Sequence, residues 1–391
     1  MATQTFDDLE PMTDGIEPIA VEEREDRIER ARELMAANGL DAIYLDAGSS
    51  LLYFTGVKWA RSERMTAAVI PALGRIAYVC PAFEEPRLLS MLTLGDDVRV
   101  WQEHESPYHL VAGILNDRGI ASGTVGMEET VRFFLFDGIR KEASDARFAG
   151  ADPVVIACRA IKSAAEIALM QRAMDITCEA FKACLARLEA GITPREFRAN
   201  NVAAHEALGV RGGTAAQFGE NTAYPHGRDD ETPLAEGDVV LMDGGCTVEG
   251  YHSDISRTIV FGEPTERQRD VWNLEHQAQA AAFAAAQVGA PCEAVDAAAR
   301  RVITDAGFGP DYEVPGLPHR TGHGIGLDCH ECTHLVRGNQ TPLAPGMCFS
   351  NEPTIAIYGE FGVRLEDCMV ITESGPRFFT QPSPSIGQPF A

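Results

Sequence analysis

The sequence predicts two domains of different architecture, an α/β domain followed by a larger α+β domain. The chain has 391 residues, and at about 100–200 residues per domain this length favours two or three domains. Up to about residue 160, short apolar runs alternate with helical stretches, which is typical of α/β domains. Beyond it, long helices flank antiparallel hairpins, which indicates an α+β domain. We expect an acidic arm over 1–20, the α/β domain over 21–160 and the α+β domain over 161–391.

The composition is that of a compact protein with an acidic surface. Apolar residues make up 45% of the chain, which disfavours intrinsic disorder. The formal net charge of −25 would repel nucleic-acid backbones and anionic membranes. No apolar stretch approaches the ~18 residues that span a bilayer, and the N-terminus lacks the basic start and apolar centre of a signal peptide. We expect a cytoplasmic protein with no nucleic-acid or membrane partner.

The ten cysteines are scattered, which fits reduced thiols better than a disulfide framework. Cys329 and Cys332 form a CxxC motif, but no second pair completes the four ligands of a structural zinc site. We therefore expect ordinary thiols.

The first domain begins with an amphipathic helix after a mobile arm. Residues 1–20 are rich in Asp, Glu, Pro and Thr and have few apolar anchors. The helix over 21–39 has an apolar face and a plausible C-cap at Gly39. The remaining expected elements are strands at 42–45, 67–70 and 76–80 and helices at 83–92 and 107–118.

The second domain opens with capped helices. Ser163-Ala-Ala-Glu166 forms a capping box, and its helix runs to about Glu189. Pro194 occupies the first position of the next helix, and Thr265 begins a third. A fourth helix covers about 292–306, and the strand-like segments are 238–243, 253–260, 347–357 and 363–371. Each half of the domain thus holds helices and one acid-bearing hairpin, which leaves open whether the halves arose by duplication.

Each of these hairpins carries two carboxylates in otherwise apolar strands. Asp243 and Asp254 are 11 residues apart about Val248-Glu249, so a turn there brings them roughly opposite each other. Glu352 and Glu366 are 14 residues apart about a second glycine-bearing turn. Opposed Cβ atoms lie about 4.5–5.5 Å apart, and two carboxylates that close repel unless one is protonated or a cation lies between them. Surface salt bridges are the alternative, which the repetition of the pattern disfavours.

A histidine-rich segment accompanies the hairpins. Residues 317–334 hold four of the ten histidines, namely His319, His323, His330 and His334. Four carboxylates and an imidazole match what a pair of borderline divalent ions takes, with Mn²⁺, Co²⁺, Fe²⁺ and Zn²⁺ as candidates. A two-metal site can activate a bridging water and stabilise both oxygens of a tetrahedral intermediate.

In this order and context, the residues resemble the pita-bread metallopeptidases, which include prolidase, aminopeptidase P and methionine aminopeptidase, with creatinase as a metal-free relative. The resemblance covers nearly the whole chain, and the segment RAIKSAAEIALM at 159–170 is similar to the family's interdomain junction. It implies a pita-bread catalytic domain preceded by a creatinase-like α/β domain. It also implies two divalent metal ions per subunit, with Mn²⁺ first among the candidates.

The resemblance assigns the metal ligands one by one. Asp243 would chelate one ion, and Asp254 and Glu366 would bridge both. His323 and Glu352 would hold the other ion. Glu352 would also move a proton between the bridging water and the leaving amine.

Four further residues match supporting positions in the family, and Trp59 is a separate candidate. His226 would donate a hydrogen bond to the substrate, and His330 would contact the scissile carbonyl or the oxyanion. His319 would line a proline pocket, and Arg364 would orient the metal ligands. Trp59 would supply an apolar wall from a neighbouring subunit. A purely structural role is the alternative for each.

Two other histidines, His252 and His334, match no family role and are expected to be structural. A substrate carboxylate would need a cation, and the sequence does not choose among the candidates. These are Arg61, Arg64, Arg228 and Arg337.

The resemblance implies hydrolysis of the Xaa-Pro bond of small peptides, and we expect an Xaa-Pro dipeptidase, or prolidase, of bacterial type. A homodimer or higher homo-oligomer is also implied. Aminopeptidase P, with the same chemistry on longer peptides, is the nearest alternative. A lyase or amidinohydrolase on the same fold and a non-catalytic binding module are disfavoured by the complete ligand set. Methionine aminopeptidase is disfavoured because it usually lacks the N-terminal α/β domain.

Overall fold

The computed structural model describes residues 5–390 of the chain. The chain forms two compact units, Ile19–Arg159 and a larger one in which the segment that ends at Pro18 joins the residues from Ala160 onward. None of the described helices is long and apolar enough to cross a membrane. The cytoplasmic location expected from the sequence stays a prediction.

The first four residues of the predicted acidic arm lie outside the described residues. The described part of the arm contacts the larger unit. Phe6 is buried, and the Met12 amide donates to the Leu208 carbonyl at 3.0 Å. Asp8 forms an ion pair with Arg187. The mobility of the arm stays a prediction.

Six strands of the smaller unit form one mixed sheet in the order β4-β3-β2-β1-β5-β6. The strands are β1 (Ala42–Asp46), β2 (Ala67–Pro71), β3 (Ala77–Pro81), β4 (Asp97–Trp101), β5 (Thr124–Met127) and β6 (Arg147–Gly150). Every residue of β1, β2 and β3 is buried, which is why the sequence predicts them as apolar runs. The edge strands β4 and β6 are partly exposed and carry little apolar pattern, so the sequence did not predict them.

Helices of the smaller unit cover the sheet. They are α1 (Val21–Asn38), α2 (Ser49–Thr55), α3 (Glu85–Leu89) after the 3₁₀ turn η1 (Ala82–Glu84), α4 (Pro107–Asp117), α5 (Phe133–Glu142) and α6 (Asp152–Ala160). α4 and α5 pack together, and Ile114 of α4 and Ile139 of α5 belong to the same buried cluster as Val69 of β2 and Val79 of β3. α1 ends at Gly39, whose φ of 66° is left-handed and favours glycine.

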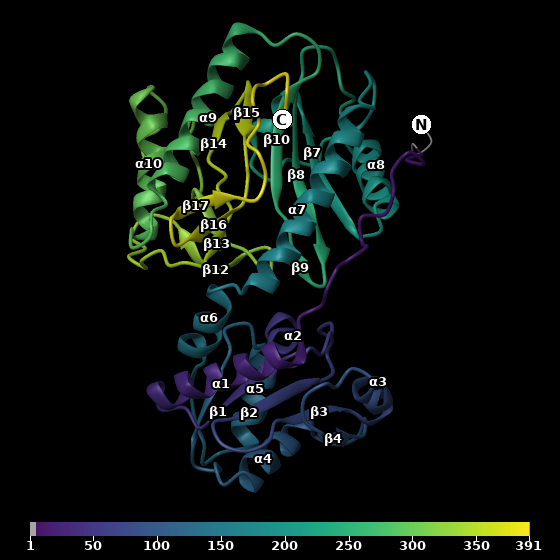
Figure 1. Cartoon of the computed structure of the whole chain (residues 1–391), viewed down its shortest axis with the longest axis vertical. Coiled ribbons are helices and arrows are strands. Elements are labelled where there is room, and N and C mark those ends of the chain that lie inside the picture. Colours follow the sequence, from purple (N-terminus) through teal and green to yellow (C-terminus); the bar gives the residue numbers. More distant parts are fainter. Residues whose placement is uncertain (1–4, 391) are drawn as a thin grey trace. The chain divides into compact units, whose positions relative to one another are not determined.

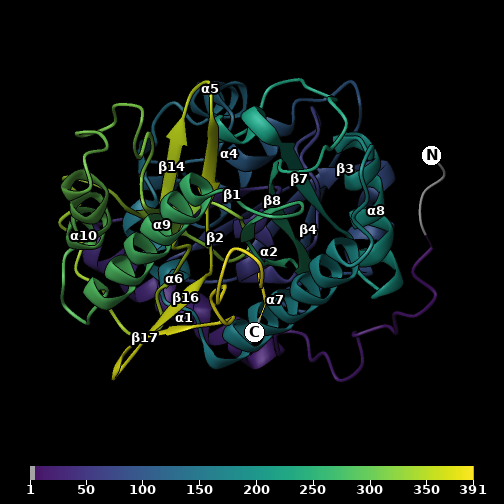
Figure 2. The same ribbon diagram turned by 90° about the horizontal axis from the view of Figure 1, so that it is seen from above.

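Four long helices frame the larger unit. They are α7 (Ala164–Leu185), α8 (Pro194–Ala207), α9 (Glu266–Ala285) and α10 (Cys292–Asp305). Ser163, Thr193 and Thr265 each form a complete capping box, which confirms the box predicted at Ser163 and the helix starts predicted at the other two. In Figures 1 and 2, α9 and α10 lie on the opposite side of the strands from α7 and α8.

The strands of the larger unit form three sheets, ordered β10-β8-β7 with β9 paired to β8, β12-β11-β13-β16-β17, and β14-β15. The first sheet and the turn η2 (Gly219–Ala223) comprise β7 (Gly212–Phe218), β8 (Val239–Val248), β9 (Tyr251–His252) and β10 (Ile255–Val260). The others comprise β11 (Gly322–Gly324), β12 (Glu331–Leu335), β13 (Cys348–Phe349), β14 (Thr354–Ile357), β15 (Phe361–Arg364), β16 (Met369–Thr372) and β17 (Gly375–Phe378).

The first acid-bearing hairpin has a register that differs from the predicted one. Val248 pairs with Tyr251, so the two-residue turn is Glu249-Gly250, with φ values of 50° and 91°. Asp243 consequently pairs with Ser256. Asp254 precedes β10 and is a diagonal neighbour of Asp243, so the two aspartates are offset by two residues from the roughly opposite placement that the sequence predicts. The centre of the turn lies one residue beyond the predicted midpoint.

The second hairpin keeps the predicted register. Thr354 pairs with Arg364 and Ile357 with Phe361, so the ladder is centred on Gly359. Glu352 and Glu366 extend this ladder on its open side, and the Glu366 amide donates to the Ser256 carbonyl at 3.1 Å. That bond brings the second hairpin onto β10 of the first.

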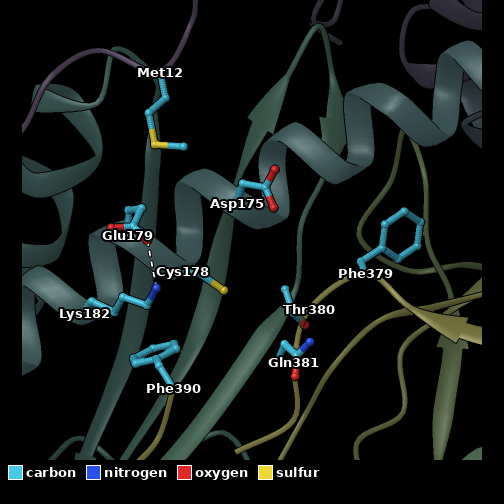
Figure 3. Close-up of a pocket in the computed structure, with 9 residues that line it drawn as sticks. All are labelled: Met12, Asp175, Cys178, Glu179, Lys182, Phe379, Thr380, Gln381 and Phe390. Atoms are coloured by element: carbon cyan, nitrogen blue, oxygen red, sulfur yellow. Dashed lines mark hydrogen bonds and ion pairs between the residues drawn. The ribbon is translucent and has the colours of Figure 1, made fainter.

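A surface cavity of about 360 Å³ lies beside α7 in the larger unit (Figure 3). Its lining includes Met12 of the arm, Lys182 of α7 and Phe390 near the C-terminus. Lys182 Nζ lies 2.9 Å from Glu179 and 5.6 Å from the centre of the Phe390 ring. No predicted site residue lines this cavity.

Candidate metal centre

The two hairpins and the histidine-rich segment converge on a second cavity of about 660 Å³ in the larger unit. Three overlapping groups of side chains each hold three ligand atoms within 4.8 Å of one another. The groups are Asp243, Asp254 and Glu366; His323, Glu352 and Glu366; and Asp254, His323 and His330. Together they contain every residue that the sequence predicts as a metal ligand.

The imidazole of His323 faces two of the carboxylates. Its Nε2 lies 3.1 Å from Oε1 of Glu352 and 3.6 Å from Oδ2 of Asp254. Its Nδ1 lies 3.0 Å from the carbonyl oxygen of Gly324, a contact suited to an Nδ1–H donor. When the ring is neutral, as it must be to bind a metal ion, that tautomer presents the Nε2 lone pair to a cation on the carboxylate side.

Arg364 and Ser256 form hydrogen bonds with two of the carboxylates. Arg364 Nη2 donates to Asp243 at 2.6 Å, Nη1 donates to the Pro225 carbonyl at 2.9 Å, and Nε donates to Ser256 Oγ at 3.1 Å. Ser256 Oγ lies 2.7 Å from Glu366 Oε2 and 3.0 Å from Asp243 Oδ1. One arginine and one serine thus fix two carboxylates from different hairpins.

Burial and mutual repulsion perturb the carboxylates strongly. Burial, followed by the charges of Asp254 and Glu352, raises the pKa of Glu366 well above its usual value. Burial and the charge of Asp243 raise the pKa of Asp254 to about 7. Burial also opposes ionisation of Glu352, but its hydrogen bond with His323 and the charge of that imidazole outweigh burial and lower its pKa to about 2. Asp254 and Glu366, the two buried carboxylates of the cluster, therefore resist ionisation unless cations join them.

The donor set fits divalent cations. Oε1 of Glu366 is buried and has no hydrogen-bond partner among the described residues, so it retains a lone pair for a cation. The groups contain carboxylate oxygens and imidazole nitrogens and no cysteine sulfur, a mixture that suits borderline metal ions. Cys329 instead contacts Asp254, with 3.0 Å between Sγ and Oδ2.

Three further histidines line the same cavity. His226 and His330 are exposed, so their rings face the solvent space in which a substrate would bind. His319 is half-buried, with Nδ1 2.7 Å from the Arg320 carbonyl and Nε2 3.0 Å from Thr354 Oγ1. Burial lowers the pKa of His319, and partial desolvation of the ring together with the charge of His323 lowers the pKa of His330, so both imidazoles are neutral near pH 7.

Other residues singled out in the sequence lie outside this cavity. Trp59 belongs to the smaller unit, where the Arg87 guanidinium lies 4.1 Å from its ring centre. Its predicted role stays a prediction. His334 pairs across the strands with His323 but does not line the cavity, and neither does His252.

The four arginines proposed as substrate cations are also absent from its lining. Arg228 and Arg337 form ion pairs with Glu220 and Asp311, and Arg61 and Arg64 belong to the smaller unit.

Two residues with clear roles were missed. Ser256 follows Asp254 by two, the spacing that puts both side chains on one face of a strand, and this was the available signal. Arg320 lies between His319 and His323 in the sequence and lines the cavity. Its place between two predicted site residues could have revealed it.

The fold and this site are those of a metallopeptidase. Residues 168–373 match the model of metallopeptidase family M24, and residues 27–161 match the creatinase/prolidase N-terminal domain. The chain therefore belongs to metallopeptidase family M24. The predicted family, the α+β fold and the creatinase-type N-terminal domain are confirmed.

Known relatives match along nearly the whole chain. The Xaa-Pro dipeptidase of Lactobacillus helveticus is 31% identical, covering 90% of this chain and 96% of its own. The solved dipeptidase PepE of Mycobacterium ulcerans is 31% identical with a TM-score of 0.86, covering 96% of this chain and 100% of its own. The solved X-Pro aminopeptidase of Thermotoga maritima is 28% identical with a TM-score of 0.81, and the match covers 92% of this chain and 99% of the aminopeptidase.

Proposed function

We propose that this metallopeptidase hydrolyses the Xaa-Pro bond of dipeptides and uses two divalent metal ions, with Mn²⁺ as the first candidate. The observation that carries the proposal is the convergence of four carboxylates and one imidazole on the wall of a cavity large enough for a dipeptide. The Xaa-Pro dipeptidase relative supports the substrate class.

The five ligands would hold the ions as a pair. Asp243 would bind one ion, His323 and Glu352 the other, and Asp254 and Glu366 both. Ions held there would supply Lewis-acid activation of a water molecule and of the scissile carbonyl.

The chain's other residues would bind the peptide and move its protons. Glu352 would take a proton on a carboxylate oxygen and return it to the departing proline nitrogen. His226 and His330, both exposed to the cavity, would each donate one N–H to the substrate carbonyl or the oxyanion that forms from it. The His319 ring, whose nitrogens are both engaged with the protein, would act as a wall for the proline ring.

Cleavage of longer Xaa-Pro peptides is the second candidate. The similarity to a solved X-Pro aminopeptidase over nearly the whole chain favours it. The two candidates share the metal chemistry and differ in whether the chain accepts substrate residues beyond the proline.

A length series of substrates tests the proposal. The protein is stripped of metal, reconstituted with Mn²⁺, Co²⁺ or Zn²⁺ in turn, and assayed on Ala-Pro, Ala-Pro-Ala and Ala-Ala. We expect metal-dependent cleavage of Ala-Pro and little of the other two. Efficient cleavage of Ala-Pro-Ala would establish the aminopeptidase alternative, and failure to cleave either proline peptide would refute both.

A further inference from the structure

Arg320 is a cation of the cavity that forms no ion pair within the described part of the chain. It is partly buried and lines the same cavity as the five ligands. Among residues 5–390, its guanidinium forms neither a hydrogen bond nor an ion pair with a protein group. An arginine guanidinium carries five N–H donors in a planar fork that matches a carboxylate. In this chain that fork is available to a ligand.

Arg364, the other arginine in the lining, is not available in this way. Each of its three nitrogens donates to a protein oxygen, and its side chain is 3% exposed. Recruiting it to a substrate would release Asp243, which is one of the metal ligands. Of the two arginines that line the cavity, Arg364 is bonded to a proposed metal ligand and Arg320 is available to bind a substrate.

Hydrogen bonds with side chains of α10 fix the backbone on both sides of Arg320. Asp296 of α10 accepts hydrogen bonds from the amide of Thr321 at 3.1 Å and from its hydroxyl at 2.8 Å. Arg300, one turn later on α10, donates to the carbonyl of His319 and to Asp296, the latter at 2.8 Å. Asp296 and Arg300 are both buried. These bonds fix the residues on both sides of Arg320 and leave its side chain to the cavity, as expected of a preorganised recognition residue.

We propose, on the basis of the function proposed above, that Arg320 binds a carboxylate of the substrate and sets specificity. A charge-assisted, bidentate pair in a partly buried site would anchor the peptide at a fixed distance from the metal ligands. Two carboxylates can meet this requirement. One is the terminal carboxylate of the dipeptide, and the other is the side chain of an acidic first residue.

The two sources have different consequences. If Arg320 binds the terminal carboxylate, a peptide extended beyond proline offers an amide at that place, so Arg320 enforces the dipeptide limit. If it binds an acidic side chain, it sets which residue is preferred before the proline and leaves the length limit unaffected.

The test combines one substitution with three substrates. Wild-type protein and Arg320→Met, both loaded with Mn²⁺, are assayed on Ala-Pro, Ala-Pro-amide and Asp-Pro. If the terminal carboxylate is the partner, Arg320→Met lowers kcat/KM for Ala-Pro by about 10- to 100-fold, mainly through KM, and leaves Ala-Pro-amide almost unchanged. If the acidic side chain is the partner, the selective loss falls on Asp-Pro.

Controls separate binding from structure. Arg320→Lys, which keeps the charge but not the fork, should show an intermediate loss with the same substrate dependence. Arg337→Met, at an exposed arginine paired with Asp311, should show no such dependence. Metal content and melting temperature establish that each variant is folded and loaded.

An equal loss of kcat/KM on all three substrates, or no loss on any, would overturn the role of Arg320. Failure of the wild-type protein to cleave any Xaa-Pro substrate would instead refute the proposed function.

Discussion

At the scale of single residues, the larger unit contains two kinds of buried acid. The metal-centre carboxylates are grouped, and Arg364, Ser256 and His323 contact them. Glu275 of α9 is fully buried outside that group. Burial raises its pKa well above the usual value, so the folded protein holds it as the neutral acid.

The Glu275→Gln substitution should stabilise the protein at neutral pH. The unfolded chain ionises Glu275 above its ordinary pKa of about 4.3, whereas the folded protein keeps it protonated. A pKa raised on folding gives a stability contribution that is full below the unfolded pKa and is lost as pH rises toward the folded pKa. We therefore expect the free energy of unfolding of the variant to exceed that of the wild type by about 1–3 kcal/mol at pH 7.5 and by much less at pH 4.5.

Thermal melts at the two pH values measure this difference. Asp270→Asn, at an exposed position of the same helix, is the matched control. Its stability difference from the wild type should be the same at both pH values. A stability difference for Glu275→Gln that is equal at both pH values would contradict the explanation.

The residues also differ in how far the sequence could predict them. Asp243, Asp254, Glu352 and Glu366 interrupt apolar strands, and an acid in a buried strand needs a partner, so their grouping could be predicted. Arg320 could not be singled out in this way. Its place between His319 and His323 was a sequence signal, but the lack of a partner for its guanidinium among residues 5–390 depends on contacts that only the fold establishes.

At the scale of elements, close backbone contacts hold the first hairpin in register. A Cβ atom at Gly245 of β8 would overlap the carbonyl oxygen of Ser253, the residue before Asp254. At Gly213 of β7, a Cβ atom would have Val202 as its nearest neighbour, at 3.7 Å. The two glycines pair across the same sheet and differ in the room around them.

We expect Gly245→Ala to destabilise the larger unit and weaken its metal binding. The added methyl must push the chain at Ser253 away from β8, at a cost of about 1–3 kcal/mol, and this displaces Asp254. Gly213→Ala is the matched control and should retain metal content and stability. Melting temperature and metal content by mass spectrometry compare the two, and equal behaviour would contradict the claimed constraint.

The registers of the two acid-bearing hairpins show how far the spacing of the acids in the sequence predicts strand pairing. Symmetry about Gly359 placed the second hairpin correctly. The same argument failed for the first because Glu249 adopts a positive φ together with Gly250, which moves the turn. Such a conformation is uncommon for a residue other than glycine. The small-residue strand β7 and the half-exposed edge strands β4 and β6 lacked the apolar pattern that prediction requires.

At the scale of the whole molecule, the chain carries a formal net charge of −25 and groups four of its acids in one cavity, two of them buried. Bound cations would relieve the repulsion within that group. The ligands belong to the larger unit, so the stability of this unit should depend on metal.

Removing metal with a chelator should lower the melting temperature of the larger unit. Adding Mn²⁺ at about 100 times its dissociation constant should raise the free energy of unfolding again by about 2.7 kcal/mol per site. Calorimetry with and without chelator measures the shift. A melting profile that is unchanged by chelation and by Mn²⁺ would contradict a metal-stabilised core.

The most direct test of the metal centre is the metal content and Ala-Pro hydrolysis of Glu366→Gln beside Glu360→Gln. Glu366 is buried within the ligand group, whereas Glu360 lies in the turn of the same hairpin and pairs with Arg267 at the surface. We predict two ions and full activity for the wild type and for Glu360→Gln. Glu366→Gln should lose most of its metal and nearly all of its activity. Near-normal metal content and turnover in Glu366→Gln would contradict the assignment of the site.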